Sequence, residues 1–364
     1  MSEPIQTRVK LSYMGTGSGN FESLIPDMLS FSYDDKETNE ADEISVTLKD
    51  PTGKWANSLT PHAGAAVGAS IVMGTVTKNL RNIYCGKFYI DSMRCAGSPR
   101  TFEFSAVSIP LNKPIRRKLK SRAWEKTTLK AIAEAVAKSA SIKLIFDSKE
   151  NPTFDRQDQT RESDLKFLSR LCEDAGLSIK VTDEQLVIFD QASYETKKPI
   201  KTLTLGESGI LSWSFEAQQS ETYKSCTVTY RDPKQKKASS VGGFYMTDAE
   251  KEAYKKAKNS AVMTFTYVDP FADENGQEYA LKKRATSVAE AERLAKAQLR
   301  KLNARRVTGS LTVVGDVDLL AGCVVNCKGF GSFDGNFIIE QATHSVSTGG
   351  YTTSLNLRRV NSNY

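Results

Sequence analysis

Residues 127–190, TTLKAIAEAVAKSASIKLIFDSKENPTFDRQDQTRESDLKFLSRLCEDAGLSIKVTDEQLVIFD, carry the clearest structural signal in the chain. Two segments repeat apolar side chains at helical spacing. Thr160 or Ser163 can cap the second helix, and Gly176 can end it. The two apolar faces are Leu129, Ile132, Ala133, Val136, Ala137 and Ala140, then Leu165, Leu168, Leu171, Cys172 and Ala175. Strands are expected at residues 142–146, 177–181 and 185–189, the last two joined by a turn at 182–184. The stretch therefore predicts a helix–strand–helix–hairpin unit.

The second half of this stretch resembles a known family. It is similar to the middle domain of the phage late control D family, the tail hub proteins of contractile phages and related injection machines. The matching positions are Gln159, Glu162, Ser163, Asp164, Leu165, Phe167, Leu168, Arg170, Leu171, Gly176, Leu177, Ser178, Lys180, Val181, Leu186, Val187, Phe189 and Asp190. They are apolar anchors, caps and turns, as a packed scaffold needs, and none implies a catalytic role.

Length and composition describe an ordinary globular protein. The chain has 364 residues, of which 39% are hydrophobic and 26% charged, which suggests two or three domains. No run reaches the roughly 18 apolar residues of a membrane span. The first residues lack the apolar core of an export signal, so we expect a chain made inside a cell with no membrane segment.

No metal or cofactor site is expected. The cysteines form no CxxC pair, and a structural zinc site needs about four cysteine or histidine ligands. We interpret the cysteines as free thiols in a reducing cytosol. The residues concerned are Cys85, Cys95, Cys172, Cys226, Cys323 and Cys327, with His62 and His344 as the only histidines.

One dense basic run stands out in a chain of net charge +7. Charge alone would allow it to contact nucleic acid. Trp124 is the only aromatic residue within it, and no nucleic-acid-binding motif surrounds it. The run is therefore interpreted as a solvated or subunit-facing linker. It comprises Lys113, Arg116, Arg117, Lys118, Lys120, Arg122 and Lys126.

The N-terminal third reads as short strands with one wet face. They are expected at residues 9–13, 29–33, 43–48, 70–73, 87–93 and 101–107. Strands at this spacing predict a sandwich or barrel. The acidic run at residues 34–43 lacks the ligand spacing of a calcium loop and is interpreted as a solvated hairpin turn.

The C-terminal part alternates strands with a helical interruption. Residues 234–260 are rich in lysine and are expected to contain a helix at 248–258. Residues 287–303 form a better-signalled helix, because Ser287 and Glu290 have capping-box spacing. Strands are expected at residues 210–215, 226–230, 262–268, 309–314, 323–327, 336–346 and 352–360.

The two β-rich regions share three short blocks in the same order, which predicts an internal repeat. The paired blocks are Val46–Pro51 with Val228–Pro233, Gly68–Ile71 with Gly322–Val325, and Gly86–Asp91 with Gly335–Glu340. The expected fold is α+β and mainly β, with two similar β-barrel domains flanking the small helix–strand–helix–hairpin domain. The expected domains are residues 1–112, 113–200 (a linker and the small domain), 201–232 plus 305–364, and an insertion at 233–304.

The C-terminal residues extend the resemblance to late control D hubs over most of the chain. The matching positions are Gly309, Leu311, Val313, Gly315, Leu320, Gly322, Val324, Gly329, Phe330, Gly331, Asp334, Gly335, Phe337, Ile339, His344, Gly349, Gly350, Tyr351, Thr352, Thr353, Leu355 and Leu357. The resemblance implies a homotrimer of pseudo-sixfold symmetry that joins a hexameric tail tube to a trimeric central spike in a contractile tail or related particle. It also implies other baseplate proteins as partners, DNA passage through the lumen without specific binding, and assembly in the bacterial host cytoplasm into a virion tail.

Two alternative functions stay open. The chain could serve as the hub of a non-contractile tail or of a secretion-type injector. A cell-wall hydrolase is the enzymatic alternative, because 43 acidic residues always offer carboxylate pairs. The chain has no GxSxG elbow and no Cys–His pairing, and His344 is interpreted as a structural hydrogen-bonding histidine. No catalytic, cofactor-binding or metal-binding residue is therefore assigned.

Overall fold

Hydrogen-bonded strands dominate the computed structural model, as the sequence predicts. The described residues are 6–13, 26–38, 41–57, 59–75, 79–109, 114–182, 184–218, 222–231, 262–269 and 276–360. The chain divides into two compact units. Unit 1 comprises residues 1–172, 177–216 and 308–360, and unit 2 comprises 173–176, 217–307 and 361–364. No helix among the described residues has the length and apolarity to cross a membrane.

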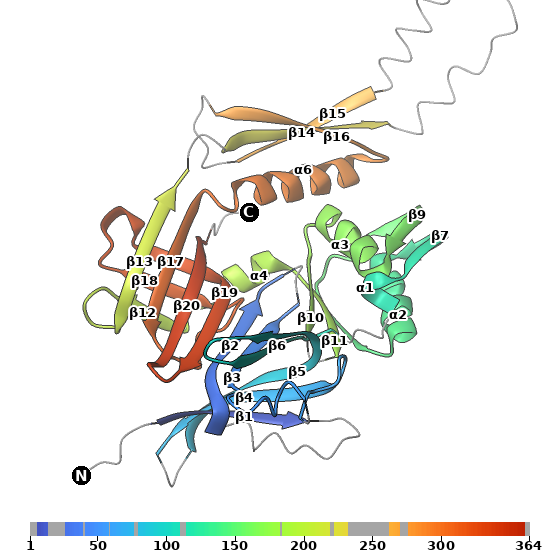
Figure 1. The fold of residues 1–364 in the computed structure, drawn as a ribbon. Helices are drawn as coiled ribbons and strands as arrows, with labels where there is room; N and C mark the ends of the chain where they lie inside the picture. The colour runs from blue at the N-terminus through green and yellow to red at the C-terminus, as the bar shows by residue number, and fades with distance from the viewer. Residues whose placement is uncertain are drawn as a thin grey trace, which may run out of the picture. The chain divides into compact units, whose positions relative to one another are not determined.

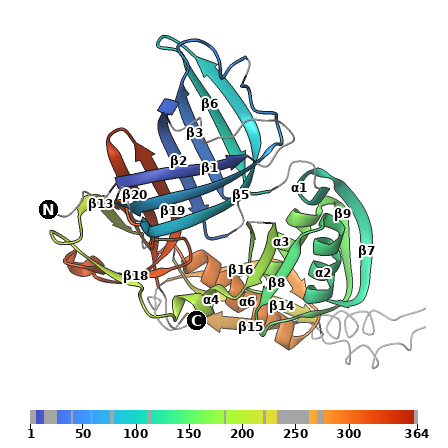
Figure 2. The same cartoon turned by 90° about the horizontal axis from the view of Figure 1, so that it is seen from below.

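Six strands form the first strand set within unit 1 (Figures 1 and 2). They are β1 (Gln6–Tyr13), β2 (Met28–Lys36), β3 (Glu43–Lys49), β4 (Ala66–Gly74), β5 (Asn79–Ala96) and β6 (Thr101–Val107). Their order in the sheet is β1-β4-β5-β6-β3-β2. Alternate residues of β2 and β3 are buried, because successive side chains of a strand point to opposite faces.

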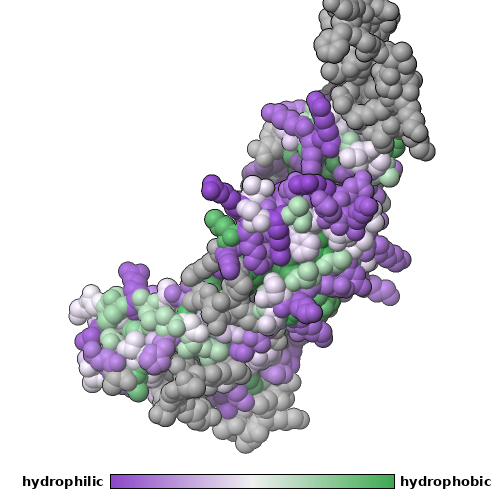
Figure 3. Space-filling model, turned by 90° about the vertical axis from the view of Figure 1, so that its right-hand side faces the viewer, coloured by the Kyte–Doolittle hydropathy of each residue, from purple (hydrophilic) through white to green (hydrophobic). Residues whose placement is uncertain are grey.

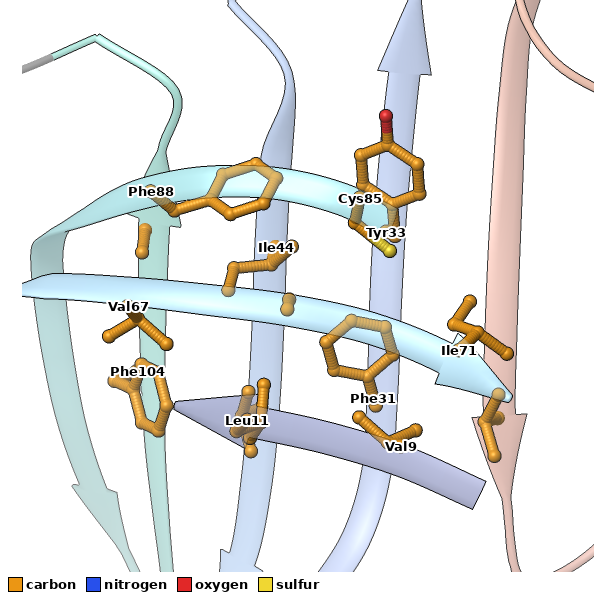
Figure 4. Close-up of a cluster of buried hydrophobic side chains, with 14 of the residues drawn as sticks. Val9, Leu11, Phe31, Tyr33, Ile44, Val67, Ile71, Cys85, Phe88 and Phe104 are labelled. Atoms are coloured by element: carbon orange, nitrogen blue, oxygen red, sulfur yellow. The ribbon is translucent and has the colours of Figure 1, made fainter. Parts of the chain in front are cut away.

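The buried faces of these strands meet in one hydrophobic core (Figure 4). Phe31, Phe88 and Phe104 are each at most 1% exposed and point into the same space as the aliphatic side chains of β1 and β4. Burial of each such side chain contributes about 1.5–3 kcal/mol. The core therefore depends on the strand alternation that the sequence displays.

A second strand set continues the same sheet. It consists of β12 (Lys201–Thr204), β13 (Ile210–Ala217), β17 (Val307–Val314), β18 (Val324–Lys328), β19 (Gly335–Ser347) and β20 (Gly350–Arg359). Strand β2 of the first set pairs antiparallel with β19, so both sets belong to one twelve-stranded sheet. The expected pair of similar β-barrels is not confirmed. The described strands form no closed barrel, and the edges of β2 and β19 join the two sets.

Five strands in each set follow the same order. The first set reads β4-β5-β6-β3-β2 and the second reads β18-β19-β20-β17-β13, with corresponding strands in the same order along the chain. Even an irregularity recurs, since a bulge skips Asp91 in the β5–β6 hairpin and Glu340 in the β19–β20 hairpin. The sixth strands differ, because β1 runs antiparallel to β4 whereas β12 runs parallel to β18.

This correspondence corrects two of the three sequence blocks. The block pairing Gly86–Asp91 with Gly335–Glu340 agrees with the bulges. The block pairing Gly68–Ile71 with Gly322–Val325 finds the right strands but is out of register, because Ala66 and Val324 occupy equivalent positions. The block that begins at Val228 is wrong, since β14 (Tyr223–Arg231) lies in another sheet and β17 takes the place of β3.

The small helical part matches its predicted elements closely. It contains α2 (Leu129–Ala140), β8 (Lys143–Asp147), α3 (Asp164–Asp174), β10 (Ser178–Thr182), β11 (Gln185–Phe189) and α4 (Gln191–Glu195). All six apolar positions of α2 are buried. Ser163, not Thr160, caps α3, because its Oγ accepts a hydrogen bond from Lys166 N at 3.3 Å. Gly176 ends α3 at φ +70°, where a side chain would be strained.

Three elements of unit 1 differ from the sequence expectation. The basic run contains a short helix, α1 (Pro114–Arg117), and most of β7 (Leu119–Thr128), which pairs with β9 (Thr153–Ser163) in a two-stranded ribbon. Most of the run is therefore part of an ordered two-stranded ribbon, where a solvated or subunit-facing linker was expected. Both faces of β7 are largely exposed, so its sequence lacks the alternation of apolar and polar residues by which a strand is recognised. The sequence therefore could not distinguish this ribbon from a linker.

Unit 2 has its own small core. Strand β14 lies between β15 (Val262–Val268) and β16 (Gln277–Ala285), and α6 (Val288–Asn303) contacts all three strands. The predicted capping residue is confirmed, because Ser287 Oγ accepts a hydrogen bond from Glu290 N at 3.2 Å. The buried side chains are Cys226, Val228, Ala285, Ala291, Leu294, Ala295 and Leu299. The expected helix at 248–258, like all of segment 234–260, lies outside the described residues.

Gly315 is required where the end of β17 meets β20. A Cβ atom there would lie 2.1 Å from the ring of Tyr351. We expect Gly315→Ala to lower the free energy of unfolding by about 1–3 kcal/mol through overpacking. Gly349→Ala is the matched control, because its added Cβ would meet only Ser347 Oγ, at an ordinary 3.6 Å. Denaturant titration followed by tryptophan fluorescence measures both, and equal losses would contradict the packing argument.

Candidate assembly surfaces and the charged junction

A buried charge cluster joins the first strand set to the β10–β11 hairpin. Lys180 Nζ lies 2.6 Å from Asp35 Oδ1 and 3.1 Å from Asp42 Oδ1. Thr182 Oγ1 donates to Asp42 at 2.7 Å, and the Ala321 amide donates to Asp35 at 2.9 Å. The solvated turn expected at residues 34–43 is therefore wrong for these acids, which are at most 5% exposed. Burial raises the pKa of Asp42, and Lys180 opposes that rise.

A second cluster surrounds Arg358 of β20. Its guanidinium pairs with Glu195 of α4, lies 3.7 Å from Glu37 after β2, and lies 3.4 Å from Glu340 of β19. Arg358, Glu37 and Glu195 are each at most 5% exposed. Burial raises the pKa of Glu37, and the charge of Arg358 opposes that rise. We call the Lys180 and Arg358 clusters together the charged junction, because they tie both strand sets to the helical part.

Buried ion pairs also attach strand β7, which carries part of the basic run, to helix α3. Asp164, the first residue of α3, is fully buried and pairs with Lys120 and Arg122 of β7. Arg122 Nη2 lies 2.8 Å from Asp164 Oδ1, and Gln159 Nε2 donates to the same oxygen at 3.0 Å. Two cations of the basic run are thus engaged with a buried carboxylate. Gln159, Asp164 and Lys180 are among the positions that resemble the late control D family. Their spacing in the sequence did not indicate that they would take part in these buried polar contacts.

His344 is a structural residue within the core. Its Nδ1 lies 2.7 Å from Tyr351 Oη, and its ring stacks on Tyr33 with centroids 5.9 Å apart. The side chain is fully buried, and burial lowers its pKa to about 4. A neutral imidazole packed between two tyrosines has no substrate access and acts as a hydrogen-bonding group.

The buried imidazole should make stability depend on pH. Its pKa is about 6.5 when unfolded and about 4 when folded, so the unfolded chain binds the proton first. The contribution of the neutral His344 imidazole to the free energy of unfolding is complete above pH 6.5 and is lost as pH falls toward 4. We expect the free energy of unfolding to fall over this window by about 3 kcal/mol more in the parent than in His344→Gln. Parallel pH profiles that never diverge would contradict the buried neutral histidine.

The cysteines and acids of the described residues form no cluster that could hold a metal ion. No group of three or more His, Cys, Asp or Glu residues within the described ranges is placed to hold an ion. Burial raises the pKa of Cys226 to about 11 and that of Cys327 to about 12, so these thiols are poor nucleophiles. Cys95 on β5 is exposed.

Two segments of the described strands pair with another described strand along one edge only. Among the described strands, β13 ends the twelve-stranded sheet and pairs only with β17. Its side chains are mostly exposed, including Leu211 at 58% and Trp213 at 49%. Residues 92–96 of β5 pair with β6, and with no second strand among those that the structure describes, and all five are exposed. Open edges of this kind are templates for pairing with another chain.

Hydropathy and charge describe the remaining surface. On the face that Figure 3 shows, hydrophobic side chains form small patches among hydrophilic ones. Residues 217–307 contain 18 Lys and Arg against 11 Asp and Glu, which leaves 32 of each sign in the rest of the chain. The net charge of +7 therefore resides in this segment, and the rest of the chain, which includes both strand sets and the helical part, is neutral as a whole.

Comparisons with known proteins agree with this architecture. The family model described as phage tail baseplate hub (GPD) matches residues 78–350. A protein of Escherichia phage 186 named "Probable baseplate hub protein" is 25% identical over 348 residues, covering 91% of this chain and 87% of the relative. The protein of the same name from Escherichia phage P2 is 25% identical over 347 residues, covering 91% and 88%.

Solved structures share the fold at low identity. A tail protein from Neisseria meningitidis MC58 matches with a TM-score of 0.66 at 14% identity over 97% of both chains. The 43 kDa tail protein of prophage MuSo2 from Shewanella oneidensis gives 0.65 at 12% identity over 99% of both chains. A type VI secretion system component from E. coli gives 0.54 at 14% identity, covering 96% of this chain and 76% of the other. With a family model matching well over half of its length, the chain belongs to the phage tail baseplate hub (GPD) family.

Proposed function

We propose that three copies of this chain close a structural ring that joins the hexameric tail tube to the trimeric central spike. The observation that carries this proposal is the shared order and register of five strands in the two strand sets. Two similar sets per chain, repeated three times, would offer six nearly equivalent surfaces to a sixfold tube. The remaining parts of each subunit would keep threefold symmetry for the spike.

The charged junction suits this mechanical role. A hub must hold its β-modules in fixed orientation while force passes along the tail. Ion pairs buried between β2, β10, α4 and β20 resist sliding, because separating either partner leaves an uncompensated buried charge. The three parts of unit 1 would therefore move as one body.

The proposed domains follow the strand sets. Strands β1–β6 form the first module, and residues 114–200 form the helical part. Strands β12, β13 and β17–β20 form the second module, into which residues 218–306 are inserted between β13 and β17. DNA would pass through the ring lumen without specific binding, and assembly would begin in the host cytoplasm before incorporation into the virion tail.

An enzymatic function is not needed to explain the chain. The relatives are named as hub proteins, and His344 is sealed in the core. We expect purified protein to release no soluble fragments from peptidoglycan in a turnover assay, whereas release above a heat-inactivated control would support a hydrolase.

A secretion-type injector is the second candidate setting. The fold likeness to a type VI secretion system component favours it, although that likeness concerns the fold alone. Neighbouring genes for a contractile sheath, a non-contractile tail or a secretion apparatus would separate these settings.

An image reconstruction of the assembled tail tip tests the ring. We expect three copies of the hub between tube and spike, with each strand set contacting one tube subunit. A single copy per particle, or a ring of six copies, would contradict the proposal.

A further inference from the structure

The joint between β2 and β19 inside the chain is a template for a joint between chains. Strand β2 ends the first set and pairs antiparallel with residues 341–347 of β19 in the second set. The equivalent of β2 is β13, which ends the second set, and the equivalent of β19 is β5. A repeat of the same joint would therefore pair β13 with the β5 of another copy.

The strand pairings within each hairpin fix the register on the β5 side. The bulges equate Asp91 with Glu340, so Arg94 corresponds to Thr343 and Ala96 corresponds to Ser345. Residues 92–96 of β5 have the open strand edge that the joint requires.

Contacts of β17 fix the register on the β13 side. Ile44 of β3 and Gly309 of β17 are equivalent, because Ala106 and Leu357 face them in the corresponding hairpins. Tyr33 lies opposite Ile44, and the ring of Phe215 covers Gly309, where a Cβ would approach it to 2.4 Å.

Phe215 therefore takes the place of Tyr33 in the second set. Counting along the two strands, Ser214 takes the place of Ser32 and Glu216 that of Asp34. Trp213 correspondingly takes the place of Phe31.

We propose that β13 pairs antiparallel with residues 92–96 of the partner subunit's β5, and that three such seams alternate with three β2–β19 joints around the ring. This inference rests on the proposed trimeric ring. In the chain, Ser32 faces Ser345 and Asp34 faces Thr343. Between copies, Ser214 faces the partner subunit's Ala96 and Glu216 faces the partner subunit's Arg94.

Exposure and charge support this seam. Phe31 is 1% exposed because it packs in the core of the first strand set, whereas its equivalent Trp213 is 49% exposed on the edge strand β13. A partner strand beside β13 would cover part of that ring. Thr343 Oγ1 donates to Asp34 in the existing joint, and the corresponding pair between copies has opposite charges, glutamate and arginine. A neighbour of opposite charge helps to fix the register and adds attraction.

Disulfide cross-linking in assembled particles tests the register. Ser214→Cys and Ala96→Cys are combined with Cys95→Ser, which removes the exposed native thiol. Cβ atoms of directly opposed residues lie about 4.5–5.5 Å apart, close enough to oxidise with slight adjustment. The control combines Ser214→Cys and Cys95→Ser with Ser92→Cys, which lies four residues along the strand and therefore about 13 Å away.

We expect a covalent trimer from the test pair and monomers from the control pair in non-reducing gels. A native mass of three copies without cross-links would overturn the seam while leaving the ring standing. A native mass other than three would overturn both. Glu216→Arg should also reduce the trimeric fraction at least tenfold, and adding Arg94→Glu should restore it. If adding Arg94→Glu to Glu216→Arg did not restore the trimeric fraction, Glu216 and Arg94 would not face each other in the seam.

Discussion

Arg358→Met is expected to lower the free energy of unfolding by about 3–5 kcal/mol at pH 7, because it removes the cation from a buried cluster of carboxylates. Glu37 and Glu195 would remain almost inaccessible to water. Burial already raises the pKa of Glu37, and without Arg358 that pKa should rise further. Methionine preserves most of the apolar contact of the arginine stem, so the loss would report charge rather than volume.

The pH dependence separates this mechanism from a packing defect. A carboxyl group whose folded pKa is raised destabilises the fold as pH climbs above its unfolded value of about 4.3. The difference between Arg358→Met and the parent should therefore shrink near pH 4 and be largest at neutral pH. Lys10→Met, at an exposed position on β1, is the control and should change stability by less than about 0.5 kcal/mol. An equal loss at both pH values would point to packing alone.

Local periodicity predicted the elements whose partners are close in sequence. The buried face of α2 and the capping residues of α3 and α6 were identified correctly, because a helix satisfies its backbone within a few residues. The same logic found the β10–β11 hairpin, whose strands are joined by a two-residue turn.

Features that depend on distant partners could not be predicted in this way. Asp35 looked solvated because its neighbours in sequence are acidic, yet Lys180 and Ala321 satisfy it from 145 and 286 residues away. Strand β14 resembled β3 because both carry a Val-Thr step before Asp-Pro, but pairing partners decide the sheet to which a strand belongs. The open edge of β13 could not be predicted either, because the exposure of Trp213 depends on the elements that lie beside β13 in the fold.

Matched alanine substitutions at equivalent positions of β2 and β13 should have opposite consequences. Phe31→Ala removes a side chain that is 1% exposed and should lower the free energy of unfolding by about 3–5 kcal/mol. Trp213→Ala removes a half-exposed ring whose nearest aromatic neighbour, Phe330, lies 5.3 Å away between ring centroids. Because much of that ring is already in water, we expect the isolated chain to lose only about 1 kcal/mol.

Assembly should reverse this ranking. Trp213 adjoins Ser214 at the end of the seam, and a tryptophan that becomes buried in an interface often contributes about 2 kcal/mol to association. Trp213→Ala should therefore weaken trimer formation by roughly thirtyfold or more, whereas any Phe31→Ala chain that folds keeps its seam residues and should still enter the ring. Unfolding titrations together with native mass measurements of the assembled hub distinguish the two effects. A Trp213→Ala hub that trimerises like the parent would show that β13 faces solvent in the particle, and the edge would then need another occupant.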